Sequence, residues 1–399
     1  MIEKRVVITG LGIISPIGIG KDNFCQGLFQ GKSGIKPVSL FDTAVYKVKT
    51  AAEVSDFVPE SFLGAKGLRT LDRSTRLLLS AVKLALEDSG LQVSADNSGD
   101  VAVAVGYTLG SIKSISDFDR EAIVDGVRYV NPAHFPNTVI NAPASQVSIR
   151  FGIKGFNATI STGFSASLDA LNYAADFIRL GRINTVLAGG VEELCEQIFL
   201  AFYKTGCLTT EPESFRPFDK RRKGLVLGEG SAILVLEDME SARKRNARIY
   251  AEIKGFGTFL DPESGLKKAM HRALDQAGLG PGDIDYISAA ANSSVIGDRQ
   301  EAEAIKDVFA KDTERVYINA VKSMTGEQYS NSGAAQAASA VCTIEKEMIP
   351  PTINFQEPDP ACGLNIVTEA KSCKVRNVLV NAFGKDGTSS SLIISKFIG

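Results

Sequence analysis

The feature of this sequence that most constrains its fold is a pair of similar segments that lie about half a chain length apart. The segments 81-AVKLALEDSGL-91 and 269-AMHRALDQAGL-279 share the spacing of Ala and Leu and the same helix-ending Gly-Leu. Strand-like runs that begin at residues 185 and 377 follow the two segments at nearly the same offset. The repeat predicts a chain built from two homologous halves that each carry the same order of elements.

Short β-branched runs alternate with longer helical patterns in both halves. The clearest runs are 5-RVVIT-9, 101-VAVAV-105, 185-TVLAGG-190, 232-AILVLE-237 and 377-NVLVNAF-383. This alternation is typical of α/β folds. No linker rich in Pro, Gly or Ser separates the halves, so we expect one compact body in which two sheets share a central helical layer. The predicted boundary near residue 248 divides the chain into 1–247 and 248–399.

Charge, cysteine spacing and the N-terminal segment exclude several classes of protein. The 44 Lys and Arg against 46 Asp and Glu leave a net charge of −2, so we expect no binding of nucleic acid or of an anionic membrane. The segment MIEKRVVITGLG resembles a strand rather than a signal peptide, which favours a cytoplasmic protein. The six cysteines lack C-x-x-C spacing, so we expect no metal site and no disulfide framework, but buried thiols.

Four motifs carry a resemblance to a known family. They are 4-KRVVITGLGIISPIG-18, 216-RPFDKRRKGLVLGEGSAILVLEDMESARKRNARIYAEIKGFG-257, 320-AVKSMTG-326 and 381-NAFGKDGTSSSLI-393. The sequence is similar to the β-ketoacyl synthases over essentially its whole length. The resemblance implies a five-layered αβαβα thiolase-like fold, which agrees with the two halves predicted from the repeat. It also implies acyl condensation on a phosphopantetheine carrier, with a Cys nucleophile at a strand-to-helix elbow and two His that stabilise an enolate.

In this sequence, all three catalytic positions of the family hold other residues. The elbow carries Phe164, whose phenyl ring has no ionisable proton and cannot form an acyl-enzyme. Ala290, in 288-SAAANSSVIGD-298, replaces the first His and donates nothing. Glu327 replaces the second His, and an ionised carboxylate only accepts hydrogen bonds. We therefore expect no catalytic residue in this chain, and no cofactor of its own.

Other family positions are partly retained. Lys322 and Glu301 are present, and we expect them to form a structural ion pair, with Glu327 also leaning on Lys322. In the C-terminal glycine loop, Lys385 and Asp386 stand where the family has a gating Phe and a Gly. The departures coincide with the catalytic machinery while the surrounding framework is intact, which favours a specialised protein over random decay.

Two other interpretations of the motifs are disfavoured. The stretch 163-GFSAS-167 approximates the nucleophile elbow of α/β hydrolases with Ser165 as the nucleophile. The glycines of 10-GLGIISPIG-18 mimic part of a dinucleotide fingerprint, but the third Gly is missing and Pro16 intrudes where the helix should begin. His271 is predicted to lie on the wet face of an amphipathic helix, so it supplies no catalytic imidazole.

Two further groups of residues are candidates for contacts with partners. The segment 131-NPAHFPNTVIN-141 resembles the part of the family that crosses the dimer interface, and it leaves open whether His134 is core or interface. The predicted tunnel or interface residues are Leu109, Ile112, His134, Phe135, Phe164 and Lys385. The run Lys220, Arg221, Arg222 and Lys223 is either a solvated loop face or a docking site for an acidic acyl carrier protein.

The resemblance favours one function and leaves two alternatives. A ketosynthase framework without its catalytic residues is typical of the chain-length factors of type II polyketide and polyene synthases. Such a subunit pairs with an active ketosynthase, shapes the acyl tunnel and leaves the phosphopantetheine chemistry to that partner. The alternatives are a decarboxylating initiation enzyme acting on malonyl carrier protein, which Ala290 and Glu327 disfavour, and a self-associating scaffold that binds carrier protein.

Overall fold

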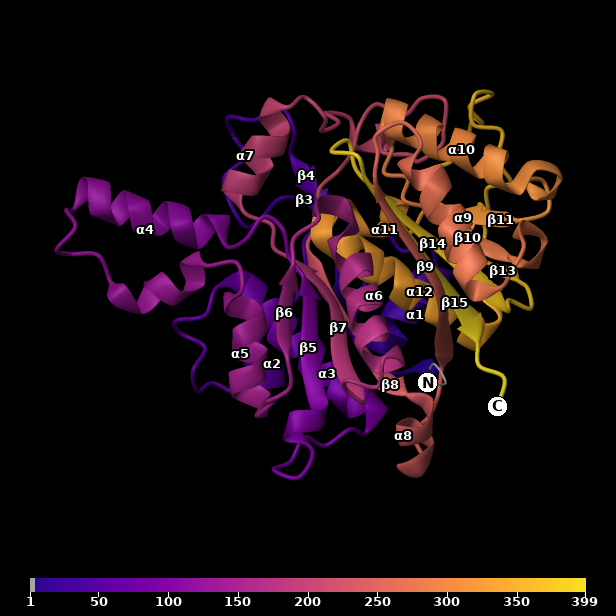
Figure 1. Ribbon diagram of the computed structural model, residues 1–399. Coiled ribbons are helices and arrows are strands. Elements are labelled where there is room, and N and C mark those ends of the chain that lie inside the picture. The colour runs from indigo at the N-terminus through magenta and orange to yellow at the C-terminus, as the bar shows by residue number, and fades with distance from the viewer. Residues whose placement is uncertain (1–3) are drawn as a thin grey trace.

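The computed structural model describes residues 4–399 and contains an 11-stranded mixed sheet made of two similar parts (Figure 1). The N-terminal part has the order β6-β5-β7-β8-β1, and the C-terminal part has the order β11-β10-β14-β15-β9. In each part the order is therefore the third, second, fourth, fifth and first main strand along the chain. The strands are β1 (Val6–Ser15), β5 (Val101–Gly106), β6 (Asn157–Ile160), β7 (Thr185–Glu192), β8 (Gly230–Asp238), β9 (Ala251–Leu260), β10 (Tyr286–Ser288), β11 (Tyr317–Asn319), β14 (Asn377–Phe383) and β15 (Thr388–Lys396).

The two parts of the sheet meet through a short joint. Strand β1 pairs antiparallel with β9, and the paired residues run from Val6 opposite Ile253 to Ile8 opposite Ala251. The shorter strands lie at the margins: β2 (Gly18–Ile19) pairs with β1, β3 (Lys36–Pro37) with β4 (Thr50–Ala51), and β12 (Met348–Ile349) with β13 (Lys371–Ser372).

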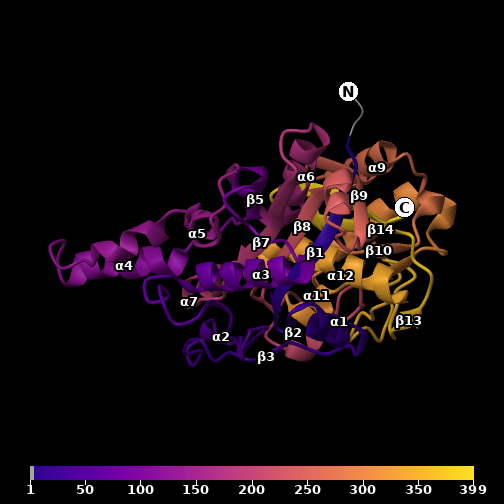
Figure 2. The same cartoon turned by 90° about the horizontal axis from the view of Figure 1, so that it is seen from below.

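Helices cover both parts of the sheet and also separate them (Figures 1 and 2). The central layer holds α6 (Ala166–Arg179) and α12 (Ser332–Lys346), with α1 (Lys21–Phe29) beside them. Helices α3 (Arg73–Ser89) and α5 (Ala142–Phe151) pack on the outer face of the N-terminal sheet, and α9 (Gly265–Ala277) and α10 (Val295–Phe309) on that of the C-terminal sheet. The five αβαβα layers predicted from the sequence are confirmed.

The side-chain alternation of the strands explains why both faces are covered. In β5, Val101, Val103 and Val105 join the outer core with α3, while Ala102 and Ala104 join the central core with α6. Successive residues of a strand point to opposite faces, so a run of uniformly apolar residues requires a helical layer on each side.

The remaining helices form the surface and the connections. They are α2 (Glu60–Leu63), α4 (Ile112–Val124), α7 (Glu196–Lys204), α8 (Met239–Lys244), α11 (Lys322–Thr325) and the 3-10 turns η1 (Ser98–Asp100), η2 (Pro132–Thr138), η3 (Gly163–Ser165), η4 (Pro212–Ser214), η5 (Pro281–Asp283), η6 (Ala310–Asp312) and η7 (Tyr329–Asn331). Helix α4 and η2 form an arm that projects from the body (Figure 1). No helix within residues 4–399 is long and apolar enough to cross a membrane.

The sequence repeat has a direct structural cause. Helices α3 and α9 occupy equivalent places, and each ends at a left-handed glycine, Gly90 with φ 64° and Gly278 with φ 66°. A Cβ added to Gly12 of β1 would lie 1.8 Å from the carbonyl oxygen of Ala81 in α3. The alanines shared by the two segments therefore lie where a helix backbone touches a strand backbone, and Gly12 belongs to a packed strand rather than to a phosphate-binding loop.

The same close packing recurs in the C-terminal half. A Cβ added to Gly257 of β9 would lie 2.2 Å from the carbonyl oxygen of Ala269 in α9. Ala269 opens the second copy of the repeat as Ala81 opens the first. The two copies therefore preserve the same helix-to-strand contact, whereas the division at residue 248 itself remains a prediction.

One sequence-based expectation about the cysteines is wrong. Cys25 of α1 and Cys342 of α12 form a disulfide, with their Cα atoms 5.9 Å apart and a sequence separation of 317. Neither cysteine belongs to a local motif, and the two meet only because α1 packs on the central helix. The four other cysteines are free thiols; Cys195 and Cys362 are buried as expected, whereas Cys207 and Cys373 are only half-buried.

Candidate functional site

The strand-to-helix elbow is present, and Phe164 lies at its centre. Strand β6 leads into η3, and α6 begins directly after it. The half-buried Phe164 ring meets the ring of Tyr329 edge-on at a centroid distance of 4.4 Å, and the ring of Phe202 contacts the same Tyr329 at 5.8 Å. A Cβ added to Gly384 would lie 2.4 Å from the Phe164 ring, so the C-terminal glycine loop packs against it. Aromatic packing therefore fills the place where the family resemblance predicts the nucleophile.

The hydrolase interpretation of this elbow is not supported. The Ser165 side chain is fully buried, and its hydroxyl donates to the backbone carbonyl of Ala382 at 3.3 Å. His271 is exposed on α9, as predicted, and His134 lies on η2. Ser165 is therefore a structural residue with a backbone partner.

At the position of the first His, Ala290 is buried and supplies only its backbone. Its amide N–H donates to Oε1 of Glu301 at 2.9 Å, and the Asn381 amide donates to the same oxygen at 3.1 Å. Complete burial raises the pKa of the Glu301 carboxyl to about 7. Glu301 thus holds the loop that carries Ala290, and its side chain supports a backbone rather than a reacting group.

At the position predicted for the second His, Glu327 is fully buried, and both of its carboxyl oxygens accept hydrogen bonds. The Lys322 ammonium donates to Oε2 at 2.8 Å, and the Asn292 amide donates to the same oxygen at 2.8 Å. Oε1 accepts from the backbone N–H of Tyr329 at 2.9 Å and from the Ser332 hydroxyl at 2.6 Å. These four bonds occupy both oxygen atoms of the Glu327 carboxyl group.

The predicted ion pair of Lys322 with Glu301 needs correction. Lys322 pairs with Glu327, and both side chains are at most 3% exposed. Glu301 Oε1 accepts hydrogen bonds from the Ala290 backbone and the Asn381 amide. The Lys322 ammonium instead contacts the carboxylate of Glu327. The further expectation that Glu327 leans on Lys322 is confirmed.

Three groups of the site were missed from the sequence. Tyr329 packs on the Phe164 ring, and Phe202 packs on Tyr329. Glu192 accepts a hydrogen bond from the Ser330 hydroxyl at 2.5 Å. Burial, followed by the negative charges of Asp386 and two glutamates, raises the pKa of Tyr329 to about 12. Burial also raises the pKa of Glu192 well above its ordinary value. Tyr329 follows Glu327 closely in sequence, and this proximity is the feature from which its place in the site could have been predicted.

The predicted tunnel or interface residues do not all lie together. Leu109 and Ile112 are half-buried and pack on the apolar cluster around Phe199. Phe135 on the arm is 58% exposed, and its ring lies 5.9 Å from that of Phe118. His134 is half-buried at the edge of a cavity of about 480 Å³ between α3, α4 and η2. Lys385 is exposed at the edge of a separate cavity of about 240 Å³.

The basic run does not form one cationic surface. Lys220 pairs with Glu357 at 2.9 Å and Lys223 with Glu211 at 2.9 Å, while Arg221 contacts Asp219 and Glu357. Arg222 is only 4% exposed, and it pairs with Asp359 at 2.6 Å. Arg222 is therefore a structural cation beneath the loop, and only the other three residues remain available to a partner.

Family models match both halves of the chain. The model of the "Beta-ketoacyl synthase, N-terminal domain" matches residues 3–242, and that of the "Beta-ketoacyl synthase, C-terminal domain" matches residues 250–356. Together with the two-part sheet and the elbow, these matches define a thiolase-like ketosynthase fold. The chain belongs to the β-ketoacyl synthase family.

Individual relatives extend over almost the full length of the chain. The chain is 37% identical over 411 residues to the 3-oxoacyl-[acyl-carrier-protein] synthase 2 of Coxiella burnetii (strain RSA 493 / Nine Mile phase I), with 99% of both chains covered. Its identity to the protein of the same name from Vibrio cholerae serotype O1 (strain ATCC 39315 / El Tor Inaba N16961) is 34%, covering 99% of this chain and 100% of the relative.

Solved structures of similar proteins include polyketide assemblies. A chain of the ishigamide ketosynthase/chain length factor superposes with a TM-score of 0.94 at 33% identity, covering 99% of this chain and 100% of that chain. A chain of AntDE:AntF, a type II PKS acyl-carrier protein in complex with its ketosynthase bound to the hexaketide, superposes with a TM-score of 0.91 at 28% identity, with 99% and 100% covered.

Proposed function

We propose that this chain is a non-catalytic ketosynthase subunit of the chain-length-factor type, which pairs with an active β-ketoacyl synthase. The observation that carries the proposal is the replacement of all three catalytic groups by structural ones. Phe164 is packed against the ring of Tyr329, Ala290 offers only a backbone amide, and Glu327 is held by four hydrogen bonds. A pocket so arranged provides neither a nucleophile nor a donor for an enolate.

The projecting arm supports the pairing part of the proposal. Exposed apolar side chains are concentrated on this arm and its flanks, namely Ile115, Ile123, Val124, Val127, Tyr129, Phe135, Val139, Ile140 and Ile149. Val127 and Tyr129 are 80% and 79% exposed. Exposed apolar surface that is gathered in one region marks a protein interface more often than isolated exposed residues do.

Two alternative functions make different demands on the site. A decarboxylating initiation enzyme would need hydrogen-bond donors to the enolate oxygen, and the saturated Glu327 carboxylate provides none. A self-associating scaffold would use the same arm but needs no ketosynthase. The mixed dimer is favoured because the ishigamide ketosynthase/chain length factor, which is so similar in structure, is named for both kinds of subunit.

Carrier-protein docking and location complete the proposal. Lys220, Arg221 and Lys223 are exposed and could meet an acidic carrier protein once they exchange their present carboxylate partners. The exposed Lys385 and the half-buried Leu109 and Ile112 belong to the proposed tunnel side of the pair. A cytoplasmic location is part of the same proposal, and burial of both disulfide cysteines would slow their reduction there.

Co-expression with a Cys-His-His ketosynthase from the same organism tests the pairing. We expect the two chains to copurify one-to-one, and the mass of the complex from light scattering to equal that of a heterodimer. Val127→Glu should abolish copurification because it buries an unpaired charge in the interface. Val45→Glu is the matched control, since Val45 is 82% exposed and lies outside the arm.

Two results would contradict the proposed function. The first is an isolated homodimer of this chain that decarboxylates malonyl carrier protein unaided. The second is normal pairing of the Val127→Glu variant, which would contradict the part of the proposal that places the partner on the arm.

A further inference from the structure

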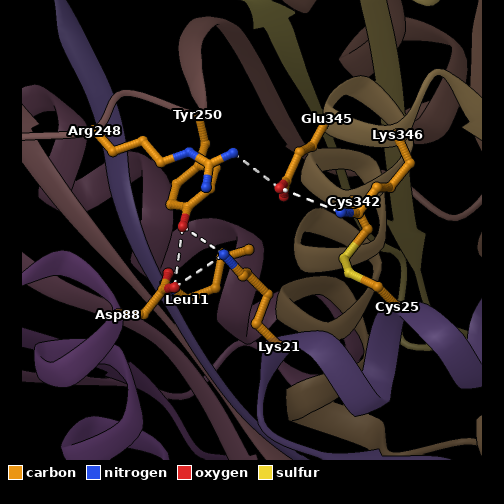
Figure 3. Close-up of a disulfide and its surroundings, with 9 residues drawn as sticks. All are labelled: Leu11, Lys21, Cys25, Asp88, Arg248, Tyr250, Cys342, Glu345 and Lys346. Carbon is orange, nitrogen blue, oxygen red and sulfur yellow. Dashed lines mark hydrogen bonds and ion pairs between the residues drawn. A yellow bond between two sulfur atoms is a disulfide. The ribbon is translucent and has the colours of Figure 1, made fainter.

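The Cys25–Cys342 disulfide joins a surface helix to the buried central helix α12 (Figure 3). Cys25 lies in α1 of the N-terminal half, and Cys342 lies in α12 of the C-terminal half. The two cysteines are only 4% and 0% exposed. A reductant therefore cannot reach the sulfur atoms unless part of the structure moves.

Helix α1 has the properties of a segment that can move as a unit. It is nine residues long, and no side chain caps its N-terminus. A left-handed glycine stands at each end, Gly20 with φ +80° and Gly31 with φ +63°. Short helices without caps are marginal in isolation, so α1 depends on its tertiary contacts. Phe24 and Leu28 supply the apolar part of those contacts, and both are fully buried.

A polar cluster holds the first turn of α1 in addition to the disulfide (Figure 3). The Lys21 ammonium lies 3.0 Å from Asp88 of α3 and 2.5 Å from the hydroxyl of Tyr250, which in turn donates to Asp88 at 3.0 Å. Lys21 and Cys25 are separated by one helical turn and lie on the same side of α1. The ionic and the covalent contact therefore both anchor this face of the helix.

We propose that α1 is a thiol-sensitive latch between the two halves of the molecule. The latch opens when the noncovalent contacts of α1 break while the disulfide still tethers it to α12, and a small dithiol then reduces the exposed bond. The S–S bond breaks, both sulfur atoms gain a proton and an electron, and the dithiol becomes a cyclic disulfide. Reduction leaves α1 held by the Lys21 cluster and by Phe24 and Leu28. This proposal is independent of the proposed pairing with a ketosynthase.

The rate of reduction of the native, oxidised chain tests the latch. The chain is incubated with dithiothreitol, free thiols are alkylated with iodoacetamide, and the intact mass is measured by mass spectrometry. The rate of reduction is determined at several urea concentrations below the unfolding transition. We expect a urea dependence much weaker than that of global unfolding, because only α1 opens. Lys21→Met should speed reduction roughly fivefold, as expected for the loss of a half-buried ion pair worth about 1 kcal/mol. Lys47→Met, at an exposed lysine, should not change the rate.

Hydrogen exchange gives a second measurement that does not depend on the variants. After reduction, the amides of α1 should exchange about tenfold faster, while those of α9 should be unchanged. The proposal is overturned if the urea dependence equals that of global unfolding, if Lys21→Met reduces at the wild-type rate, or if refolding in a thiol–disulfide buffer yields six free thiols.

Discussion

The buried Lys322–Glu327 pair gives the sharpest test of the idea that Glu327 is a structural anion. The two side chains are 3% and 0% exposed, and their charged atoms lie 2.8 Å apart. Replacing Lys322 by Met removes the cation and keeps most of the side-chain volume. The carboxylate of Glu327 would then remain buried with only three neutral donors, from Asn292, Tyr329 and Ser332.

The expected cost follows from the burial of the pair. Removing one partner of a buried ion pair destabilises a protein by about 3–5 kcal/mol, because it leaves an uncompensated charge in a medium of low dielectric constant. The double variant Lys322→Met with Glu327→Gln has no charge left to bury, so its stability should lie within about 2 kcal/mol of the wild type. The coupling energy between the two positions should therefore be on the order of 3 kcal/mol.

Urea unfolding monitored by far-UV circular dichroism measures all four corners of this cycle. The midpoint should fall without a change in slope for the single variants. Lys83→Met is the control, because Lys83 and Glu87 form an exposed pair with side chains 42% and 56% exposed. We expect Lys83→Met to lower the free energy of unfolding by less than about 0.5 kcal/mol. Additive effects at residues 322 and 327, or a cost below about 1 kcal/mol for Lys322→Met, would refute the role of Glu327 as the partner of this lysine.

Further predictions concern the elbow, a second buried acid and the disulfide. Phe164→Cys should not restore condensation of malonyl carrier protein, because Ala290 still donates nothing, and restored turnover in a radiolabelled assay would contradict the proposed function. Burial, followed by the charge of Asp72, raises the pKa of Glu193 to about 8, so the stability from its protonated form is complete below about pH 4.5 and is lost as the pH rises to about 8. Glu193→Gln should remove this loss of about 1.4 kcal/mol per pH unit. Equal slopes of the free energy of unfolding against pH for the wild type and the variant would contradict this prediction. Replacing Cys25 and Cys342 by Ser should lower the free energy of unfolding by about 5 kcal/mol without reductant, and little with it, since the bond closes a loop of 317 residues.

The architecture could be predicted from the sequence because backbone packing leaves a strong mark on it. The alanines of the repeat, Ala81 and Ala269, lie against glycines of β1 and β9, where any larger side chain would separate helix from strand. That contact recurs once in each half, so it appears as a repeat. The assignment of Phe164, Ala290 and Glu327 to the catalytic positions of the family rests on the motifs that contain them, and it stays a prediction.

The partners of buried charges could not be predicted in the same way. Lys322 was expected to pair with Glu301, but the choice between two acids depends on which carboxylate already has donors. The disulfide was missed for a related reason, because only the packing of α1 on α12 brings Cys25 to Cys342. Arg222 looks like its surface neighbours in sequence, and only the fold reveals that it is buried.

The equivalence of the two halves has a consequence for the site around Phe164 and Glu327. The elbow follows β6 and precedes α6, while Glu327 follows β11 and precedes α12, so the two loops hold corresponding places in their halves. The pocket therefore lies where two central helices begin, and the partial positive charge of a helix start comes from its backbone. Substitution of side chains cannot remove that field. The Glu327 carboxyl group lies at the start of α12, where it accepts a hydrogen bond from the Ser332 hydroxyl and where the field of the helix favours a negative charge.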